Sequence, residues 1–373
     1  MSPQIEEIFI GLMSGTSIDA IDAAAVVIDK DNDKHVNVIA THTHTIPSNI
    51  KHAITSLCQP GDNEIMRMGE LDHQLGELFA SATLELLRSN GLKSSQISAI
   101  GSHGQTIRHM PNGKYPFTLQ IGNPALISEL TNITTIADFR RADLAAGGQG
   151  APLVPAFHQA IFNHDQIKRV ILNIGGMANI SIVENGKVSG FDTGPGNILL
   201  NEWILKNKNL AYDKDGAWAK EGTINLELLD KMLGDNYFTQ PPPKSTGREH
   251  FNLDWINTQT TELNTSSENI QCTLSELTAK TIADAIKIYA SNCEEVLVCG
   301  GGVHNEDLIA RLQKHCIARV FSTEKVGVNP DYVEAAAFAW FARQTLHNIP
   351  SNIPAVTGAK RLAILGATYH ASR

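Results

Sequence analysis

Two stretches of this 373-residue sequence share one plan, and the repeat constrains the fold more than any other feature. In each stretch, residues 8–28 and residues 169–183, a short apolar run ends in a turn of small residues and a second apolar run follows. Short apolar runs joined by such turns predict β-hairpins. Because the chain is long enough for two hydrophobic cores, the two hairpins predict two similarly built domains.

Strands and helices alternate along the rest of the chain. Apolar residues recur at three- and four-residue steps over residues 64–90, which predicts a long amphipathic helix, and a strand follows at 97–100. Strand, helix and strand form a βαβ unit, in which ligand sites gather at the carboxyl ends of the strands. We therefore predict an α/β fold of two domains, the first comprising residues 1–163 with 346–373 returning to it, and the second residues 164–345.

The composition excludes several classes of protein. The formal net charge of -9 leaves no basic surplus to neutralise the phosphates of a nucleic acid. The 5 cysteines include no C-x-x-C pair, which argues against a disulfide framework and a structural zinc site. No apolar run approaches the ~20 residues of a membrane span, and the N-terminus lacks the pattern of a signal peptide. We expect a cytoplasmic protein with neither a nucleic-acid nor a membrane partner.

Asp192 lies at the most concentrated group of chemical features in the chain. It ends a strand-like run and precedes Gly194-Pro195-Gly196, after which a helix is predicted from Asn197. The N-terminus of a helix offers unpaired N–H groups to an anion, so this carboxylate would lie beside a phosphate site. The alternative is a tight turn in which Asp192 caps the helix. The residues around it leave both interpretations open.

Polar or small residues also follow other predicted strands. His103 and Gln105 come directly after the strand at 97–100, and three successive glycines, residues 300–302, follow a strand at 296–299. Successive glycines predict close approach of the backbone to a flat or bulky group. The chain has neither a P-loop nor a strand-placed G-x-G-x-x-G, so the common nucleotide-binding motifs are excluded.

The turn after the first predicted strand is a second candidate phosphate site. Gly15, Thr16 and Ser17 can supply N–H and hydroxyl donors, and Asp19 could hold a magnesium ion directly or through water. The alternative interpretation of Asp19 is a solvated turn residue.

Two further groups of residues are left out of the predicted site. His42 and His44 share one face of a predicted strand, but no third ligand follows at a spacing suited to zinc. Lys244 and Arg248 could meet phosphate, but they stand in a Pro-rich stretch that is more typical of a surface loop.

Six motifs together resemble one family, and they occur in order over nearly the whole chain. They are GLMSGTS (11–17), GSHGQT (101–106), NIGGMAN (173–179), FDTGPGN (191–197), PPPKSTGRE (241–249) and CGGGVHN (299–305). In these motifs the sequence resembles anhydro-N-acetylmuramic acid kinase. That family belongs to the sugar kinase, Hsp70 and actin superfamily, whose two ribonuclease-H-like domains close over ATP, so the resemblance implies an interdomain ATP cleft.

The resemblance also implies a reaction. ATP, with Mg²⁺, would phosphorylate O6 of 1,6-anhydro-N-acetylmuramic acid while water opens the anhydro bridge at C1, giving N-acetylmuramic acid 6-phosphate for peptidoglycan recycling. Phosphoryl transfer needs positioning and charge neutralisation, and glycosidic cleavage needs a base for the water. Asp192 is the catalytic base that the resemblance implies. We expect a small-molecule amino sugar as the partner, and a homodimer.

The remaining site residues divide between the two substrates. Those expected to contact ATP or its metal are Gly15, Thr16, Ser17, Asp19, Asp22, Gly175, Gly176, Gly194, Gly196, Gly300, Gly301, Gly302, His304 and Asn305, with Asp19 also the metal ligand. Those expected to contact the sugar are His103, Gly104, Gln105, Arg140 and Glu334. Arg140 could pair with the lactyl carboxylate as a fork of donors, and Arg141 could serve instead.

Two other functions remain open on the residues. One is an ordinary sugar kinase, in which Asp192 deprotonates a substrate hydroxyl without ring hydrolysis. The other is an Hsp70- or actin-like ATP-binding protein that works through conformational change.

Overall fold

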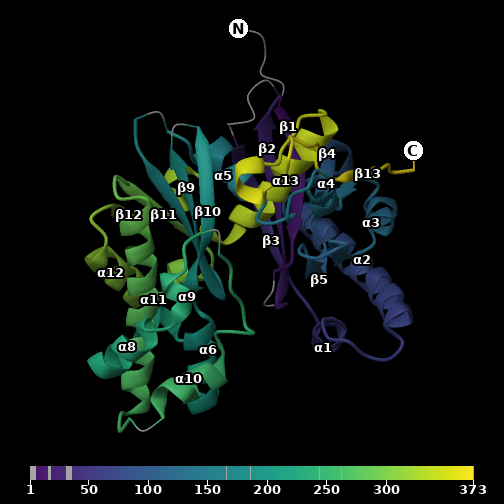
Figure 1. Ribbon diagram of the computed structural model, residues 1–373. Helices are drawn as coiled ribbons and strands as arrows, with labels where there is room; N and C mark the ends of the chain where they lie inside the picture. The colour runs from purple at the N-terminus through teal and green to yellow at the C-terminus, as the bar shows by residue number, and fades with distance from the viewer. Residues whose placement is uncertain are drawn as a thin grey trace. The chain divides into compact units, whose positions relative to one another are not determined.

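The chain folds into two compact units of mixed helices and strands, which confirms the predicted α/β class (Figure 1). The computed structural model describes residues 6–15, 18–30, 36–164, 166–184, 186–242, 244–261 and 263–372. The first unit comprises Met1–Ile161 with Tyr332–Arg373, and the second comprises Phe162–Asp331. Among the described residues, no helix combines the length and the apolar character that crossing a membrane requires.

The first unit is built on a six-stranded sheet with the order β13-β7-β4-β1-β2-β3. Its strands are β1 (Glu6–Met13), β2 (Ala20–Asp29), β3 (Val36–Thr45), β4 (Ile97–Ser102), β7 (Thr135–Ala137) and β13 (Ala367–Tyr369). β1, β2 and β3 pair antiparallel, which includes the predicted hairpin, whereas β4 runs parallel to both β1 and β7. A separate hairpin, β5 (Gln105–Met110) and β6 (Phe117–Ile121), directly follows β4.

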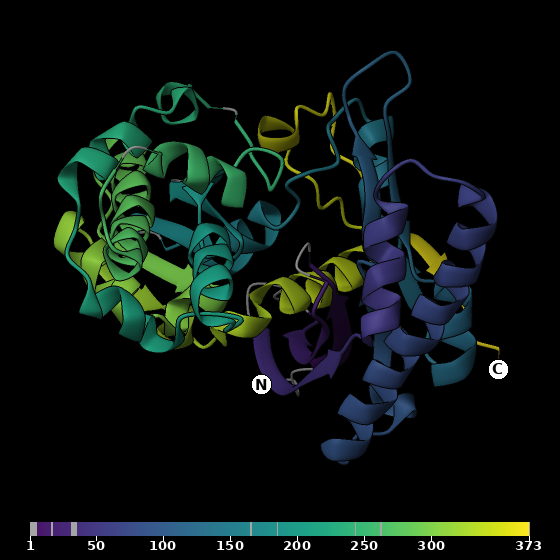
Figure 2. The ribbon, with the colours of Figure 1, turned by 90° about the horizontal axis from the view of Figure 1, so that it is seen from below.

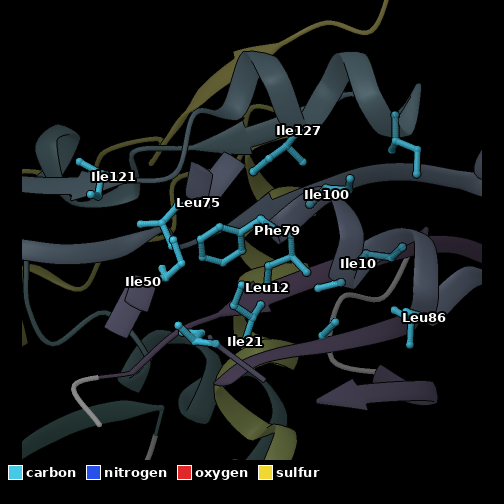
Figure 3. Close-up of a cluster of buried hydrophobic side chains, with 14 of the residues drawn as sticks. Ile10, Leu12, Ile21, Ile50, Leu75, Phe79, Leu86, Ile100, Ile121 and Ile127 are labelled. Carbon is cyan, nitrogen blue, oxygen red and sulfur yellow. The ribbon is translucent and has the colours of Figure 1, made fainter. Parts of the chain in front are cut away.

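Helices cover both faces of this sheet. They are α1 (Ser48–Leu57), α2 (Glu64–Ser89), α3 (Pro124–Thr131), α4 (Phe139–Ala145), α5 (Pro155–Phe162), which reaches the second unit, α13 (Val333–Leu346) and α14 (Pro354–Thr357). The predicted amphipathic helix is confirmed as α2. Its Leu75 and Phe79 are fully buried and belong to one core cluster with Leu12, Ile21 and Ile100 of the sheet (Figure 3).

Helix α13 packs on the sheet through two glycines. A Cβ atom at Gly11 would lie 1.7 Å from the carbonyl oxygen of Ala335, and one at Gly101 would lie 2.0 Å from that of Phe338. The helix backbone therefore lies directly against β1 and β4, and Figure 2 shows α13 along the strands near the N-terminus. We expected residues 332–345 in the second domain, and this assignment is wrong because these contacts place α13 in the first unit.

The second unit repeats the strand plan of the first. Its sheet has the order β10-β9-β8-β11-β12, with β8 (Arg169–Ile174), β9 (Met177–Glu184), β10 (Lys187–Pro195), β11 (Glu295–Cys299) and β12 (Arg319–Ser322). The first three strands in the chain again pair antiparallel, and β8, β11 and β12 run parallel. The predicted second hairpin is thus confirmed as β8 and β9.

Two hydrophobic clusters hold the second unit together. Long helix α11 contributes Ile282 and Ile286 to a cluster with Leu172 and Val298 of the sheet, and to a second cluster it contributes Leu274 and Leu277. The helices of this unit are α6 (Ile198–Lys208), α7 (Ala217–Glu221), α8 (Leu226–Leu233), α9 (Asn236–Thr239), α10 (Leu253–Thr260), α11 (Ser267–Tyr289) and α12 (Glu306–His315). Short 3₁₀ turns at Ser94–Gln96, Lys214–Gly216, Gly301–His304, Thr323–Val326 and Pro330–Tyr332 complete the described elements.

Candidate active site

Asp192 lies at an irregularity near the end of β10. In the pairing with β9, Asp192 is opposite Asn179 and Gly194 is opposite Ala178. Thr193 is therefore an extra residue in β10 and forms a β-bulge. Gly194 has a φ of +150°, and a Cβ there would lie 2.7 Å from the ring of Phe238. A glycine is therefore required at position 194, in the bulge beside Asp192. The side chain of Asp192 is half-buried.

Three hydrogen bonds hold Asp192 to a segment that follows it in the chain by about fifty residues. The backbone N–H of Thr246 donates to its carboxylate Oδ2 at 3.1 Å, and its own backbone N–H donates to the carbonyl oxygen of Lys244 at 3.2 Å. The hydroxyl of Tyr237 donates to its carbonyl oxygen at 2.6 Å. Sequence reasoning missed these partners, because it assigned the Pro-rich stretch to a surface loop. The signal was present, since residues 241–249 form one of the six family motifs.

The environment of Asp192 suits a general base. Burial raises the pKa of its carboxyl to about 6, the Thr246 N–H lowers this pKa, and the charge of Glu249 raises it. A carboxylate with a pKa near neutrality is ionised at neutral pH and yet takes up a proton readily. The side chain does not cap α6, because Asn197 holds the N-cap position and no side-chain capping bond forms there.

The backbone N–H groups that lead into α6 are already used. Those of Gly196, Asn197 and Ile198 donate to the carbonyl oxygens of Gly175 and Gly176, at 2.8, 2.8 and 3.1 Å. We expected such N–H groups to be open to a phosphate, and for these three residues the expectation is wrong because the β8–β9 turn accepts them. Gly176 itself has open space where a Cβ would stand, so this glycine leaves room for a ligand.

The glycines after β11 approach the neighbouring strand. A Cβ at Gly300 would lie 2.3 Å from Oδ1 of Asn173, and one at Gly302 would lie 2.3 Å from Cγ2 of Ile174. Their close approach is therefore to the end of β8, and Gly301 is the glycine of the three that has open space at its Cβ position.

The two polar residues after these glycines have partners within the second unit. Oδ1 of Asn305 accepts from the backbone N–H of Leu308 at 3.0 Å and caps α12. Nε2 of His304 lies 2.8 Å from Oδ1 of Asp331. The side chain of Asn305 thus has a structural role as the N-cap of α12.

His103 and Arg140 form a buried pair in the first unit. Nδ1 of His103 lies 2.8 Å from the carbonyl oxygen of Gly104, and Nε2 accepts from Nε and Nη2 of Arg140 at 3.1 and 2.9 Å. Because a carbonyl only accepts and a guanidinium only donates, the ring is neutral with its proton on Nδ1. Burial and the Arg140 charge lower the pKa of His103 to about 3, in agreement with this tautomer.

Arg140 and Arg141 point to different surroundings. Arg140 also donates from Nη1 to the carbonyl oxygen of Gly150 at 2.8 Å, and burial lowers its pKa to about 10, so it stays charged at neutral pH. Arg141 pairs with Asp138 at 2.5 Å, and its side chain is 66% exposed. The geometry therefore favours Arg140 as the arginine that faces the set of predicted sugar-binding residues.

Two carboxylates complete this group in the first unit. Burial raises the pKa of Glu334, the charge of Arg140 lowers it, and the charge of Asp22 raises it. Oδ1 of Asp22 accepts from the hydroxyl of Thr43 at 2.9 Å. In the same unit, the buried Gln105 accepts from the hydroxyl of Ser14 at 2.7 Å. The predicted residues His103, Gln105 and Arg140 thus lie in one unit with Glu334, apart in the chain from Asp192.

The residues considered for metal binding are placed less favourably. Asp19 is exposed and forms an ion pair with Lys51, while Thr16 and Ser17 lie outside the described residues. His42 and His44 form only a pair, with Nε2 and Nδ1 3.3 Å apart. Within the described part of the chain, no group of three His, Cys, Asp or Glu side chains is arranged to hold a metal ion.

A duplicated α/β plan with a half-buried carboxylate whose pKa is shifted towards neutrality is typical of an enzyme that moves protons. The chain belongs to the anhydro-N-acetylmuramic acid kinase family, whose model it matches over residues 7–371. The anhydro-N-acetylmuramic acid kinase of Vibrio cholerae is 48% identical over 98% of both chains, and that of Coxiella burnetii is 49% identical over 98% of both. The chain is accordingly a kinase, and the resemblance inferred from the six motifs is confirmed.

Solved structures of similar shape have much lower sequence identity. The activator of the 2-hydroxyisocaproyl-CoA dehydratase from Clostridium difficile is 13% identical with a TM-score of 0.47, over 91% of this chain and 96% of that chain. A ROK family glucokinase from Streptomyces griseus is 13% identical with a TM-score of 0.40, over 90% of this chain and 99% of that chain.

Proposed function

We propose that this kinase opens the 1,6-anhydro ring of 1,6-anhydro-N-acetylmuramic acid with water and phosphorylates O6 from ATP, giving N-acetylmuramic acid 6-phosphate in peptidoglycan recycling. The names of the relatives support the substrate. The observation that supports the hydrolytic step is Asp192, whose carboxylate is held by the Thr246 N–H and has a pKa of about 6.

Asp192 would take a proton from the attacking water. The water oxygen forms a bond to C1, the C1–O6 bond breaks, and the departing O6 bonds to the γ-phosphorus as ADP leaves. Because phosphorus captures O6, this scheme needs no separate acid for the leaving oxygen. A positioned base typically contributes ~10²–10⁴-fold in rate.

The His103–Arg140 pair would bind the sugar. The guanidinium carries five N–H groups. Nε and Nη2 each donate one to His103, and Nη1 donates one to Gly150, so two N–H groups are left for a carboxylate. His103 orients the guanidinium, and a fixed fork of donors suits the lactyl carboxylate of the muramic acid. Glu334, whose pKa is raised by burial and lowered by the charge of Arg140, would accept a hydrogen bond from a sugar hydroxyl or the N-acetyl group.

Mg²⁺ supplies charge neutralisation on the phosphates when it is bound. Such an ion is commonly held by one or two carboxylates together with the phosphates, so the carboxylates of Asp19 and Asp22 are suitable ligands for it. Asp19 would exchange Lys51 for the ion or bind it through water. Gly15, Gly176 and Gly301 have open space at their Cβ positions and are our candidates for backbone contact with ATP.

Turnover in ¹⁸O-labelled water tests the proposal. The hydrolytic kinase places the label at C1 of the product, whereas an ordinary sugar kinase that uses Asp192 to deprotonate a hydroxyl leaves C1 unlabelled. Release of ADP that does not depend on the anhydro sugar would instead favour the Hsp70- or actin-like alternative. The expected cytoplasmic location and homodimer are tested by cell fractionation and by light scattering.

A further inference from the structure

We propose that Tyr237 is a positioning residue for Asp192, acting with Lys244 in a clasp formed by residues 235–238 and 244–246 that fixes the direction of the carboxylate. This inference rests on the proposed role of Asp192 as the base. It assigns a function to the Pro-rich stretch, for which the sequence favoured a surface loop, and to the short helix α9, which precedes that stretch.

The contact between Tyr237 and Asp192 is short and buried. The Tyr237 hydroxyl donates to the backbone carbonyl oxygen of Asp192 at 2.6 Å, and the tyrosine is 3% exposed. Burial and the charge of Asp192 raise the pKa of Tyr237, so the hydroxyl keeps its proton and remains the donor. Because this bond ends on the backbone of the bulge, it fixes the site from which the carboxylate projects.

Lys244 connects helix α9 with Asp192. Its ammonium donates to the carbonyl oxygen of Tyr237 at 3.1 Å and to that of Phe238 at 3.4 Å, and it lies 4.6 Å from the centre of the Tyr237 ring. Its own carbonyl oxygen accepts from the Asp192 N–H at 3.2 Å. Lys244, which the sequence offered as a possible phosphate ligand, therefore forms hydrogen bonds within the protein.

Asp235 anchors the start of the clasp to the residues that follow it. One of its oxygens, Oδ1, accepts from the N–H of Tyr237 at 2.9 Å. The other, Oδ2, lies 3.0 Å from Nε2 of His250 and accepts from Nε1 of Trp255 at 2.9 Å. The rings of Phe251 and Phe238 also contact Tyr237, with centroids 5.7 and 5.9 Å away. Tyr237 thus has a fixed position, as a residue that positions another must have.

The consequence concerns the bond from the Thr246 N–H to Asp192 Oδ2. This bond forms only while the bulge and the clasp keep their relative position, and it stabilises the ionised carboxylate. Loss of the Tyr237 hydroxyl releases the Asp192 carbonyl and lets the carboxylate move away from Thr246. Catalysis then declines without loss of substrate binding, because no residue of the clasp is among those proposed to bind ATP or the sugar.

The test is Tyr237→Phe, which removes one hydroxyl and keeps the ring packing. We expect kcat to fall roughly 10- to 100-fold, as for a small misplacement of a catalytic group, with both KM values within about twofold of the wild type. The acidic limb of the kcat–pH profile should move to higher pH, because the ionised carboxylate loses its N–H donor. Lys244→Met should produce the same direction of change through the other half of the clasp.

Tyr289→Phe is the matched control, since the Tyr289 ring packs edge-on against Phe191, the residue before Asp192, at 4.9 Å between centroids. We expect wild-type kcat and an unchanged acidic limb from this variant. A Tyr237→Phe enzyme with unchanged kcat and limb overturns the inference, as does a fall in melting temperature with no change in the limb. Full activity in Asp192→Asn would instead overturn the proposed base, which separates the two failures.

Discussion

The guanidinium of Arg140 donates through two nitrogen atoms to Nε2 of His103, and this contact keeps the imidazole neutral. Burial and the nearby positive charge together lower the pKa of His103 to about 3. The histidine therefore acts as an acceptor that orients Arg140, and it cannot serve as an acid at neutral pH.

Arg140→Ala should raise the KM for the anhydro sugar by about 100-fold or more and leave the KM for ATP unchanged. The reason is the loss of hydrogen bonds to a charged carboxylate, each contributing about 1.5–3 kcal/mol. Steady-state kinetics with each substrate varied in turn provide the measurement.

Two controls define the partner of Arg140. Arg141→Ala should behave as the wild type, because Arg141 is exposed and pairs with Asp138. With 1,6-anhydro-N-acetylglucosamine, which lacks the lactyl carboxylate, Arg140→Ala should cost little beyond the low activity expected for that analogue. An equal loss on both sugars would contradict the assignment of the carboxylate.

The rate should depend on the ionisation of Asp192 on the acidic side of neutrality. The proton of Asp192 must be absent for the base to act, and its pKa is about 6, so kcat/KM should fall below pH 6. His103, with a pKa of about 3, and Arg140, with a pKa of about 10, do not titrate in this range. A profile that is flat from pH 5 to 8 would contradict the assignment of the base.

Asp192→Asn should lose activity and gain stability. The folded protein raises the pKa of this carboxyl from its usual value of 3.8 to about 6, so folding opposes the ionised form above pH 4. At neutral pH the cost is of order 3 kcal/mol, which an amide does not incur. The advantage of Asp192→Asn in urea unfolding should shrink as the pH falls from 7 towards 5, because the wild-type carboxyl then takes up its proton.

Much of the fold follows from local patterns in the chain. The hairpins β1–β2 and β8–β9 and the helix α2 could be predicted because apolar periodicity and turn residues act over short distances. The position of α13 could not be predicted in this way. Its residues 333–346 follow the second unit in sequence, and only the paired contacts of Gly11 and Gly101 with its backbone show that it belongs to the first.

The candidate site shows the same limit. Asp192 could be singled out because a carboxylate between a strand and a glycine-rich turn is a local pattern. Its partner Tyr237 could not, since a hydrogen bond to a backbone carbonyl leaves no signature in composition or spacing, and Thr246 was marked only by its place in the family motif at 241–249. The expected open N–H groups before α6 failed for a related reason, because the Gly175–Gly176 turn that uses them is about twenty residues earlier in the chain.

Gly11→Ala should destabilise the first unit severely, whereas Gly69→Ala should not. A methyl group at Gly11 would overlap the Ala335 carbonyl at 1.7 Å, so α13 must move from β1, and overpacking of this kind typically costs about 1–3 kcal/mol or more. Gly69 lies within α2 with open space at its Cβ position, and alanine there should add about 0.5–1 kcal/mol to the free energy of unfolding. Urea unfolding of both variants gives the comparison. Because Glu334 lies in the first turn of α13, Gly11→Ala should also raise the KM for the sugar. A stable Gly11→Ala variant with wild-type kinetics would show that the packing of α13 on β1 is not required.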